Sequence, residues 1–235
     1  MSDEFRVPTG DGDRLIHDFA PASQDDWKAL TRGLERRVHG VFASRKMQAS
    51  IPWRNRAERD LMVLLEADGR VLGYEHLTDR ITLSTGGKAR VHYPSFRVRT
   101  ATGRVLVDVF RVAPGRRGAD HPIAQMVARA CEQTGRAYRA LSEAEVHLRP
   151  RFDNARHVLG YRRMTPDPAT VLRVTEVLSR RSGTATVRQI AADLPDEPQA
   201  AGTVFAMALR SIVCLDMSAV DPLDMRATLR ARGLS

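Results

Sequence analysis

The stretch HYPSFRVRTATGRVLVDVFR, residues 92–111, decides the fold. It predicts a β-hairpin, because a strand through Tyr93 and Phe96 leads into a polar turn and an apolar strand, 105–110, follows. This second strand carries one carboxylate, Asp108, among its apolar residues. Since a buried charge is costly unless it is paired, the carboxylate indicates either a structural ion pair or a functional site.

The neighbouring segments predict an α/β fold around the hairpin. Residues 55–68 have the spacing of an amphipathic helix, with one apolar face made of Ala57, Leu61, Leu64 and Leu65. Further elements are strands at about 70–76, 79–84, 89–99 and 104–112, and helices at 121–133 and 151–162. A strand at 137–141 follows helix 121–133, so we expect a β-α-β unit with parallel strands and a mixed sheet.

The two ends of the chain differ from this core. Residues 1–38 are expected to form a loose segment and a short helix, and 39–53 a basic, extended arm. Beyond Thr165-Pro-Asp-Pro168, helical patterns precede a small apolar hairpin, which is typical of a winged-helix module; they cover 169–180, 187–194 and 199–213. The expected domains are therefore 39–166, an α/β domain, and 167–235, a small winged-helix-like domain.

Composition points to an anionic partner. The chain has 235 residues, 43% of them hydrophobic, which suits one large or two small domains. Its 37 Lys and Arg residues exceed its 28 Asp and Glu residues, and nearly all of the cations are arginine. Arginine suits bidentate contacts with phosphate, so the net charge of +9 predicts nucleic acid as the partner. A GC-rich genome is the alternative explanation of the arginine content.

The excess charge is confined to the first part of the chain. Residues 167–235 contain eight Arg and eight Asp or Glu residues, whereas residues 1–166 carry the net +9. The phosphate-binding surface is therefore expected in 1–166. A neutral winged helix is more often a module that docks a protein than a reader of DNA.

The sequence also indicates a compartment. Only Cys131 and Cys214 are present, without the spacing of a disulfide framework or a zinc site. The acidic, polar start does not resemble a signal peptide, and no apolar run approaches the roughly 18 residues of a membrane span. We expect a soluble, cytoplasmic bacterial protein that makes no membrane contact and is nucleoid-associated if it binds DNA.

The hairpin matches the frame of one class of metal-dependent nuclease. In that class, carboxylates bind divalent ions that activate water and stabilise the leaving oxygen. Residues i and i+2 of a strand face the same side, so the second acid and the lysine of the pattern PD…(D/E)xK meet in one cleft. Pro94-Ser95 and Asp108-Val109-Phe110 keep the spacing of thirteen residues, but serine replaces the first acid and phenylalanine the lysine.

The flanking residues make the match more specific. The stretches HGVFASRKMQASIPW, AERDLMVLLEADGRVLGYE, YPSF and GRVLVDVF, in this order, resemble the N-terminal domain of the TnsA-type transposon endonucleases. A later stretch, RACEQTGRAYRALSEAEVHLRPRFDNARHVLGYRR, is similar to the same family, so the resemblance covers about residues 38–235. It implies a restriction-endonuclease-like fold of the PD-(D/E)xK superfamily, with flanking helices. It also implies a winged-helix-like C-terminal domain, which in that family contacts DNA or the partner ATPase.

The resemblance implies four site positions. Glu58 matches the helix glutamate of the family, and Ser95 matches its first aspartate. Asp108 matches the acid or amide of the second strand, and Phe110 matches the catalytic lysine. Glu58 and Asp108 are thus the residual catalytic residues and, if a metal is bound, its ligands. No cofactor is expected, or Mg²⁺ or Mn²⁺ if the protein is an active nuclease.

Structural explanations of the same residues stay open. A partner such as Arg97 or Arg99 is expected for Asp108, and the helix dipole for Glu58, if neither carboxylate is catalytic. A lysine from the preceding turn, Lys88, is a candidate to replace the missing one. The expected DNA contacts are Arg45, Lys46, Arg54, Arg56 and Lys88, although the basic arm is alternatively a solvated linker.

Three functions are consistent with these observations. The first is a catalytically inactive DNA-binding or adaptor protein with a TnsA-like endonuclease fold. It would bind double-stranded DNA through residues 1–166 and a transposase or ATPase-type protein through 167–235. The second is a metal-dependent endonuclease, a transposase subunit with a rearranged active site, and the third is a winged-helix transcription regulator. The lost acid and lysine favour the first function, a pseudonuclease in a transposition-related or host role.

Overall fold

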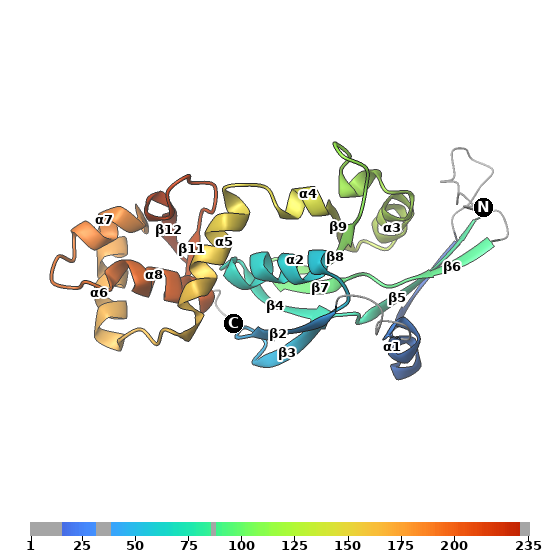
Figure 1. Cartoon of the computed structure of the whole chain (residues 1–235), viewed down its shortest axis with the longest axis horizontal. Helices are drawn as coiled ribbons and strands as arrows, with labels where there is room; N and C mark the ends of the chain where they lie inside the picture. The colour runs from blue at the N-terminus through green and yellow to red at the C-terminus, as the bar shows by residue number, and fades with distance from the viewer. Residues whose placement is uncertain (1–15, 32–38, 86–87, 231–235) are drawn as a thin grey trace. The chain divides into compact units, whose positions relative to one another are not determined.

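The chain folds as a mixed α/β protein (Figure 1). The computed structural model describes residues 16–31, 39–85 and 88–230, so expectations for 1–15 and 32–38 lie outside it. Contacts divide the chain into two compact units. The first comprises 1–42, 51–59 and 74–146, and the second comprises 43–50, 60–73 and 147–235. In the described part of the chain, every helix is too short or too polar to cross a membrane.

A four-stranded mixed sheet contains the predicted hairpin. Its strands lie in the order β4 (Val71–His76), β7 (Phe96–Thr100), β8 (Gly103–Phe110) and β9 (Ala137–Ser142). β7 and β8 are antiparallel, with Phe96 opposite Val107, whereas β8 and β9 are parallel, with Asp108 beside Ala140. Helix α3 (Pro122–Gln133) connects the two parallel strands, which confirms the predicted β-α-β unit.

A second sheet corrects two expectations. Its order is β1 (Ile16–Pro21), β5 (Asp79–Thr85) and β6 (Lys88–His92), with both pairings antiparallel. The expectation of a loose N-terminal segment is therefore wrong for β1. The single strand expected at 89–99 is two strands, β6 and β7, which belong to different sheets. Pro94 accounts for the break, because proline has no N–H to donate to a strand ladder.

The basic arm at 39–53 is paired rather than simply extended. It forms a two-stranded sheet from β2 (Gly40–Ser44) and β3 (Ala49–Trp53). A Cβ on Gly40 would lie 2.6 Å from a carbon of the Trp53 ring, so the close approach needs glycine. The expected linker is therefore an ordered hairpin that leads directly into helix α2 (Arg56–Ala67).

Helix periodicity places the core. The apolar face expected on α2 is buried at all four positions, Ala57, Leu61, Leu64 and Leu65. Helix α3 buries Met126, Val127 and Ala130 against Ile81 of β5 and Leu106 of β8. The shorter elements are α1 (Gln24–Thr31), α4 (Glu143–Val146), η2 (Gly118–Asp120), η3 (Tyr161–Arg163) and η4 (Pro222–Asp224).

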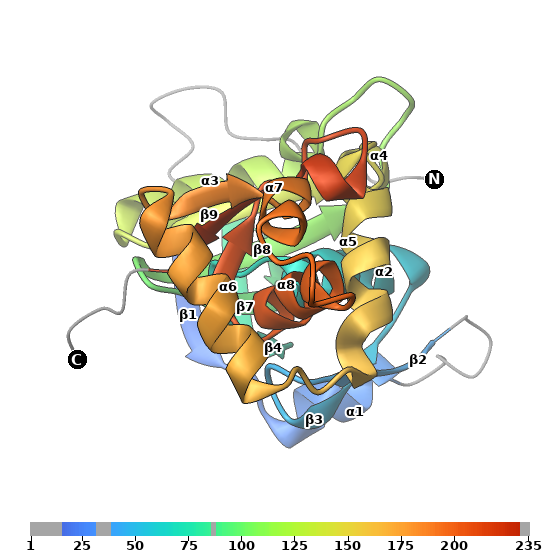
Figure 2. The same cartoon turned by 90° about the vertical axis from the view of Figure 1, so that its left-hand side faces the viewer.

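The second unit contains the helices expected after residue 167 (Figure 2). They are α6 (Pro168–Arg180), α7 (Val187–Ala192) and α8 (Ala200–Leu209). The same unit contains a small three-stranded sheet of order β10-β12-β11. Its strands are β10 (Thr184–Thr186), β11 (Val213–Leu215) and β12 (Arg226–Leu229). Helix α8 is the most buried of these helices, since nine of its ten residues are buried.

Helix α5 (Arg151–Gly160) groups with this second unit, although the sequence places a boundary after residue 166. Two long-range contacts explain the grouping. The ring of His157 packs edge-on against Phe205 of α8, with 5.0 Å between the ring centroids. The side-chain amide of Asn154 donates hydrogen bonds to the carbonyls of Met217 and Ala219. These partners lie far away in the sequence, so local composition does not reveal them.

The loop between β8 and α3, residues 111–121, is held at its base by Glu145. The Glu145 carboxylate accepts hydrogen bonds from the backbone N–H groups of Gly118 and Ser142, each at 2.8 Å. Gly118 is buried, and a Cβ added to it would lie 2.2 Å from the carbonyl carbon of Leu141. The loop therefore passes so close to β9 that it needs a residue without a side chain.

We predict that Gly118→Ala lowers the free energy of unfolding by roughly 1–3 kcal/mol, because backbone atoms cannot yield to the added methyl group. The matched control is Gly160→Ala, where an added Cβ meets no atom within 4 Å at a helical backbone position. That change should stabilise the protein by up to about 1 kcal/mol. Urea unfolding of both variants measures the difference, and equal stability of the two would contradict the close approach.

Candidate functional site

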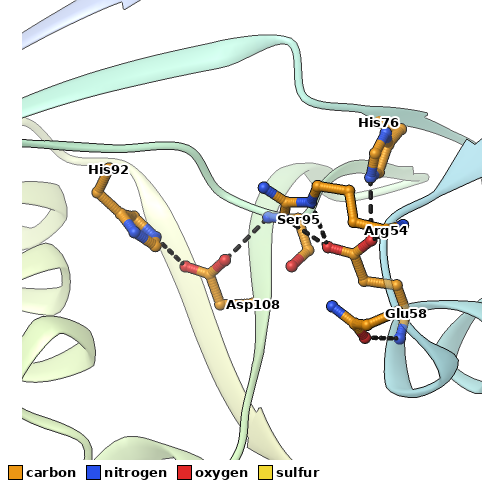
Figure 3. Close-up of polar contacts among 7 residues, drawn as sticks. Arg54, Glu58, His76, His92, Ser95 and Asp108 are labelled. Atoms are coloured by element: carbon orange, nitrogen blue, oxygen red, sulfur yellow. Dashed lines mark hydrogen bonds and ion pairs between the residues drawn. The ribbon is translucent and has the colours of Figure 1, made fainter. Parts of the chain in front are cut away.

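Glu58, the helix carboxylate of the residual motif, is completely buried and holds four hydrogen bonds to its oxygens (Figure 3). The Arg54 side chain donates through Nε and Nη2 to one oxygen, at 2.9 Å for Nε. The other oxygen accepts from the backbone N–H of Arg54 at 2.7 Å and lies 3.2 Å from His76 Nε2. The Asn55 side chain accepts from the Glu58 backbone N–H and so begins α2.

These contacts keep Glu58 ionised. Burial alone raises the pKa of a carboxyl group. The hydrogen bond with His76 and the charge of Arg54 outweigh that effect and hold the pKa of Glu58 at about 2. The structural explanation by the helix dipole is therefore incomplete, since a specific guanidinium and an imidazole neutralise this first-turn acid.

Asp108, the carboxylate of the hairpin, is 2% exposed and is also fully paired (Figure 3). One oxygen accepts from the backbone N–H of Ser95 at 2.8 Å. The other lies 2.7 Å from His92 Nε2 and accepts from the hydroxyl of Tyr138 at 2.9 Å. Burial and the neighbouring Asp108 charge raise the pKa of Tyr138 well above its usual range, so this hydroxyl keeps its proton.

The prediction that an arginine such as Arg97 or Arg99 pairs with Asp108 is wrong. Arg97 pairs with Asp79, with Nη2 2.6 Å from the carboxylate, because its side chain reaches β5 instead. Arg99 lies opposite Arg104 in the β7–β8 register, near the turn of the hairpin. The partners that the structure provides, His92 and Tyr138, come from β6 and β9.

Phe110, two residues after Asp108 on β8, is part of an aromatic stack. Its ring lies 4.3 Å from the ring of His121 at an interplanar angle of 16°, and 6.0 Å from that of His92. Burial and then the proximity of His92 lower the pKa of His121. The Phe110 ring thus packs against two imidazoles at this end of β8.

The donors around the two carboxylates do not suit a divalent ion. Such an ion needs carboxylate oxygens that are free to coordinate it, and an adjacent guanidinium opposes it by charge repulsion. Both oxygens of Glu58 face Arg54, and both oxygens of Asp108 already accept hydrogen bonds. Within the described ranges, no group of three or more His, Cys, Asp or Glu side chains is placed to hold a metal ion.

The predicted DNA contacts have different surroundings. Arg54 is engaged by Glu58, and Lys46 donates to the carbonyls of Leu65 and Asp68, the last residues around the end of α2. Burial lowers the pKa of Lys46 to about 8, and a cation at this end of a helix stabilises it. The charged groups of Arg54 and Lys46 are therefore both bound by other groups within the fold.

The other three predicted contacts are exposed. Arg45 donates to the carbonyl of Arg162, and Arg56 makes no side-chain ion pair with any residue that the structure describes. Lys88 begins β6, and His92 ends it. Four residues of strand span about 13 Å, which is longer than a lysine side chain, so the structure does not bring Lys88 to Asp108.

Sequence reasoning missed His76, His92 and Tyr138 as partners of the carboxylates. The three residues are isolated in the sequence and show no metal-binding spacing, so they carry no local signal. Strand alternation holds the one available clue, because Tyr138 lies beside Leu106 in the parallel register and faces the same side as Asp108. The pairing of His92 depends on how the second sheet meets the first.

We predict that Glu58 contributes about 3 kcal/mol of stability that depends on pH, from a pKa of 4.5 in the unfolded chain and about 2 in the folded one. Because the folded pKa is depressed, this stability is present above pH 4.5 and is lost as the pH falls toward 2. In Glu58→Gln, the urea concentration at the midpoint of unfolding should therefore change less with pH over that range than in the wild type. Asp153→Asn, which changes a half-exposed carboxylate, should follow the wild type; identical profiles for both variants would contradict the assignment.

We also predict that Arg54→Ala destabilises the protein by about 3 kcal/mol, since it leaves a buried charge with a weaker set of partners. Arg56→Ala is the control, because this neighbouring arginine is exposed, and its effect should stay below about 0.5 kcal/mol. Adding Glu58→Gln to Arg54→Ala should recover part of the loss. Strictly additive effects in this double-mutant cycle, measured by urea unfolding, would show that the two side chains are not coupled.

Comparison with family models and with curated proteins gave no match. The functional case therefore rests on the contacts of Glu58 and Asp108, on the distribution of charge, and on the resemblance of the motif.

Proposed function

We propose that this protein is a catalytically inactive DNA-binding or adaptor protein, built on a TnsA-like, restriction-endonuclease-like domain with a winged-helix-like C-terminal part. The observation that carries the proposal is the internal pairing of both residual carboxylates. Arg54 and His76 occupy the oxygens of Glu58, and His92, Tyr138 and the Ser95 N–H occupy those of Asp108. A nuclease needs these oxygens for metal ions and water.

The arrangement of the hairpin supports the same proposal. A helix, α2, carries Glu58, and an antiparallel hairpin carries Ser95 and Asp108 thirteen residues apart. The Ser95 N–H donates to Asp108, so the two motif positions are neighbours in space as well as in pattern. Phe110 stacks on His121 where the pattern requires a cation. These positions support the proposal that the chain keeps the frame of the motif but not its reactive groups.

Unpaired arginines on the first unit support DNA binding. Four exposed arginines of this unit, Arg56, Arg99, Arg104 and Arg111, have no ion pair or side-chain hydrogen bond to any described residue. Arg99 and Arg104 lie directly opposite each other on β7 and β8. Like charges in this register destabilise a sheet, and an anionic partner such as a phosphate backbone would relieve the repulsion.

Three arginines of the C-terminal region are paired with carboxylates instead. Arg173 binds Glu197, and Arg181 binds Asp193. Arg188, on the helix α7 that would enter DNA in a helix-turn-helix reader, lies 2.8 Å from both Asp221 and Asp224. The neutralised recognition helix favours protein docking over DNA reading for this region, and so favours an adaptor over a winged-helix regulator.

We predict that the pure protein shifts labelled duplex DNA on native gels and leaves both strands intact on denaturing gels, in manganese and in EDTA alike. Because the carboxylate oxygens are engaged, Mn²⁺ should also leave the unfolding temperature unchanged. Binding should weaken steeply with salt, as phosphate neutralisation requires. Manganese-dependent nicks that disappear in Asp108→Ala would instead establish the endonuclease. Absence of both shift and nicks would point to a protein partner alone.

The regulator is tested by Arg188→Ala in the full chain. We predict that this change leaves DNA affinity and sequence preference within about twofold of the wild type, since the guanidinium is already bound by two aspartates. Binding is measured by fluorescence anisotropy on several duplex sequences. A loss of sequence preference in Arg188→Ala, with nonspecific binding retained, would favour the transcription regulator.

A further inference from the structure

A cavity lies beside Phe110, and none of the residues that line it belongs to the nuclease-like motif. It measures about 350 Å³ and is lined by the loop after β8 and the first turn of α3: Arg111, Val112, Ala113, Arg116, Asp120, His121 and Pro122. This volume is at the lower end of the range for small-ligand pockets. The loop is fixed at its base, where Glu145 binds the N–H of Gly118, so the cavity belongs to an anchored segment.

The lining is cationic, and few carboxylates occupy the hydrogen-bond donors of its arginines. Arg111 is exposed and makes no ion pair or side-chain hydrogen bond with any residue in the described ranges. Arg116 reaches one acid, Asp120, at a long 3.7 Å. The Asp120 carboxylate also accepts from the backbone N–H of Arg117 at 2.8 Å. The lining thus contains two guanidinium groups and one carboxylate, which leaves positive charge in the cavity.

His121 supplies a third donor. Its Nδ1 accepts from the backbone N–H of Ile123 at 3.3 Å, so the neutral ring carries its proton on Nε2. The ring of Phe110 fixes the imidazole by stacking at 4.3 Å. The phenylalanine that replaced the lysine therefore orients a neutral N–H donor at the wall of a cationic cavity.

We propose that this cavity binds one backbone phosphate of the DNA, through Arg111 and His121 with support from Arg116. A phosphodiester offers several acceptor oxygens and one negative charge, which matches two guanidinium groups and an N–H donor. The proposal rests on the proposed DNA binding and deepens it by placing a phosphate contact beside the residual site. It uses residues outside the motif and outside the contacts that the sequence predicts.

The test is anisotropy of a labelled duplex with the full-length protein over a series of salt concentrations. Arg111→Ala should weaken binding about tenfold on every duplex sequence. It should also reduce the slope of log affinity against log salt by about one, as the loss of one phosphate contact requires. Arg111→Lys should retain most of the slope, because it keeps the charge. Arg116→Ala should act in the same direction, with a smaller effect.

Arg139→Ala is the matched control. Arg139 is an equally exposed and unpaired arginine of the same unit, and it follows Tyr138 on β9. Since consecutive strand residues face opposite sides and Tyr138 binds Asp108, Arg139 faces away from the residual site. Its loss removes the same charge, so a general effect of net charge would appear in both variants.

The outcomes separate the two proposals. If the wild type binds DNA and Arg111→Ala equals Arg139→Ala in affinity and slope, the cavity assignment is overturned while the proposed function stands. If the wild type binds no DNA, the proposed function fails first. A third arm adds inorganic phosphate at matched ionic strength. A phosphate-induced rise in unfolding temperature that Arg111→Ala abolishes, with DNA binding unaffected, would assign the cavity to free phosphate and overturn the DNA contact.

Discussion

Pairing of two buried carboxylates is the constraint on which the first unit depends. Glu58 and Asp108 are almost inaccessible to water, and a buried charge is tolerated when it has partners of opposite charge or several hydrogen-bond donors. Those partners come from many places in the sequence. Arg54 precedes α2, His76 ends β4, His92 ends β6, and Tyr138 lies on β9. Satisfying the two charges therefore connects the helix, both sheets and the β-α-β unit.

The same pairing changes what the site can do. A metal-dependent nuclease keeps carboxylate oxygens exposed to ions and water, at a cost in stability that function requires. Here a guanidinium, two imidazoles, a phenol and a backbone N–H take those places. A buried network of hydrogen bonds favours one arrangement of its members. The two carboxylates therefore support the fold, and the exposed arginines without carboxylate partners are the groups available for the proposed phosphate binding.

Charge is organised differently before and after residue 167. The net charge of +9 lies within residues 1–166, and the first unit holds exposed arginines without carboxylate partners. After residue 167, Arg173, Arg181 and Arg188 each form an ion pair with a carboxylate. Salt-bridged surface arginines contribute little field at a distance, because their partners cancel it. This contrast is the physical basis for the proposal that residues before 167 bind DNA and that the C-terminal helices bind a protein.

The sequence by itself determined the elements and their faces. Local periodicity predicted α2 and α3 with their buried positions, the β7–β8 hairpin and the parallel β8–β9 pair, since these depend on neighbours within one element or one connection. Tertiary structure alone decided the partners of the carboxylates, the pairing of β1 with β5, and the grouping of α5 with α8. Each of these joins residues that are distant along the chain. His92 meets Asp108 because two sheets converge, and no local pattern encodes where separate sheets come together.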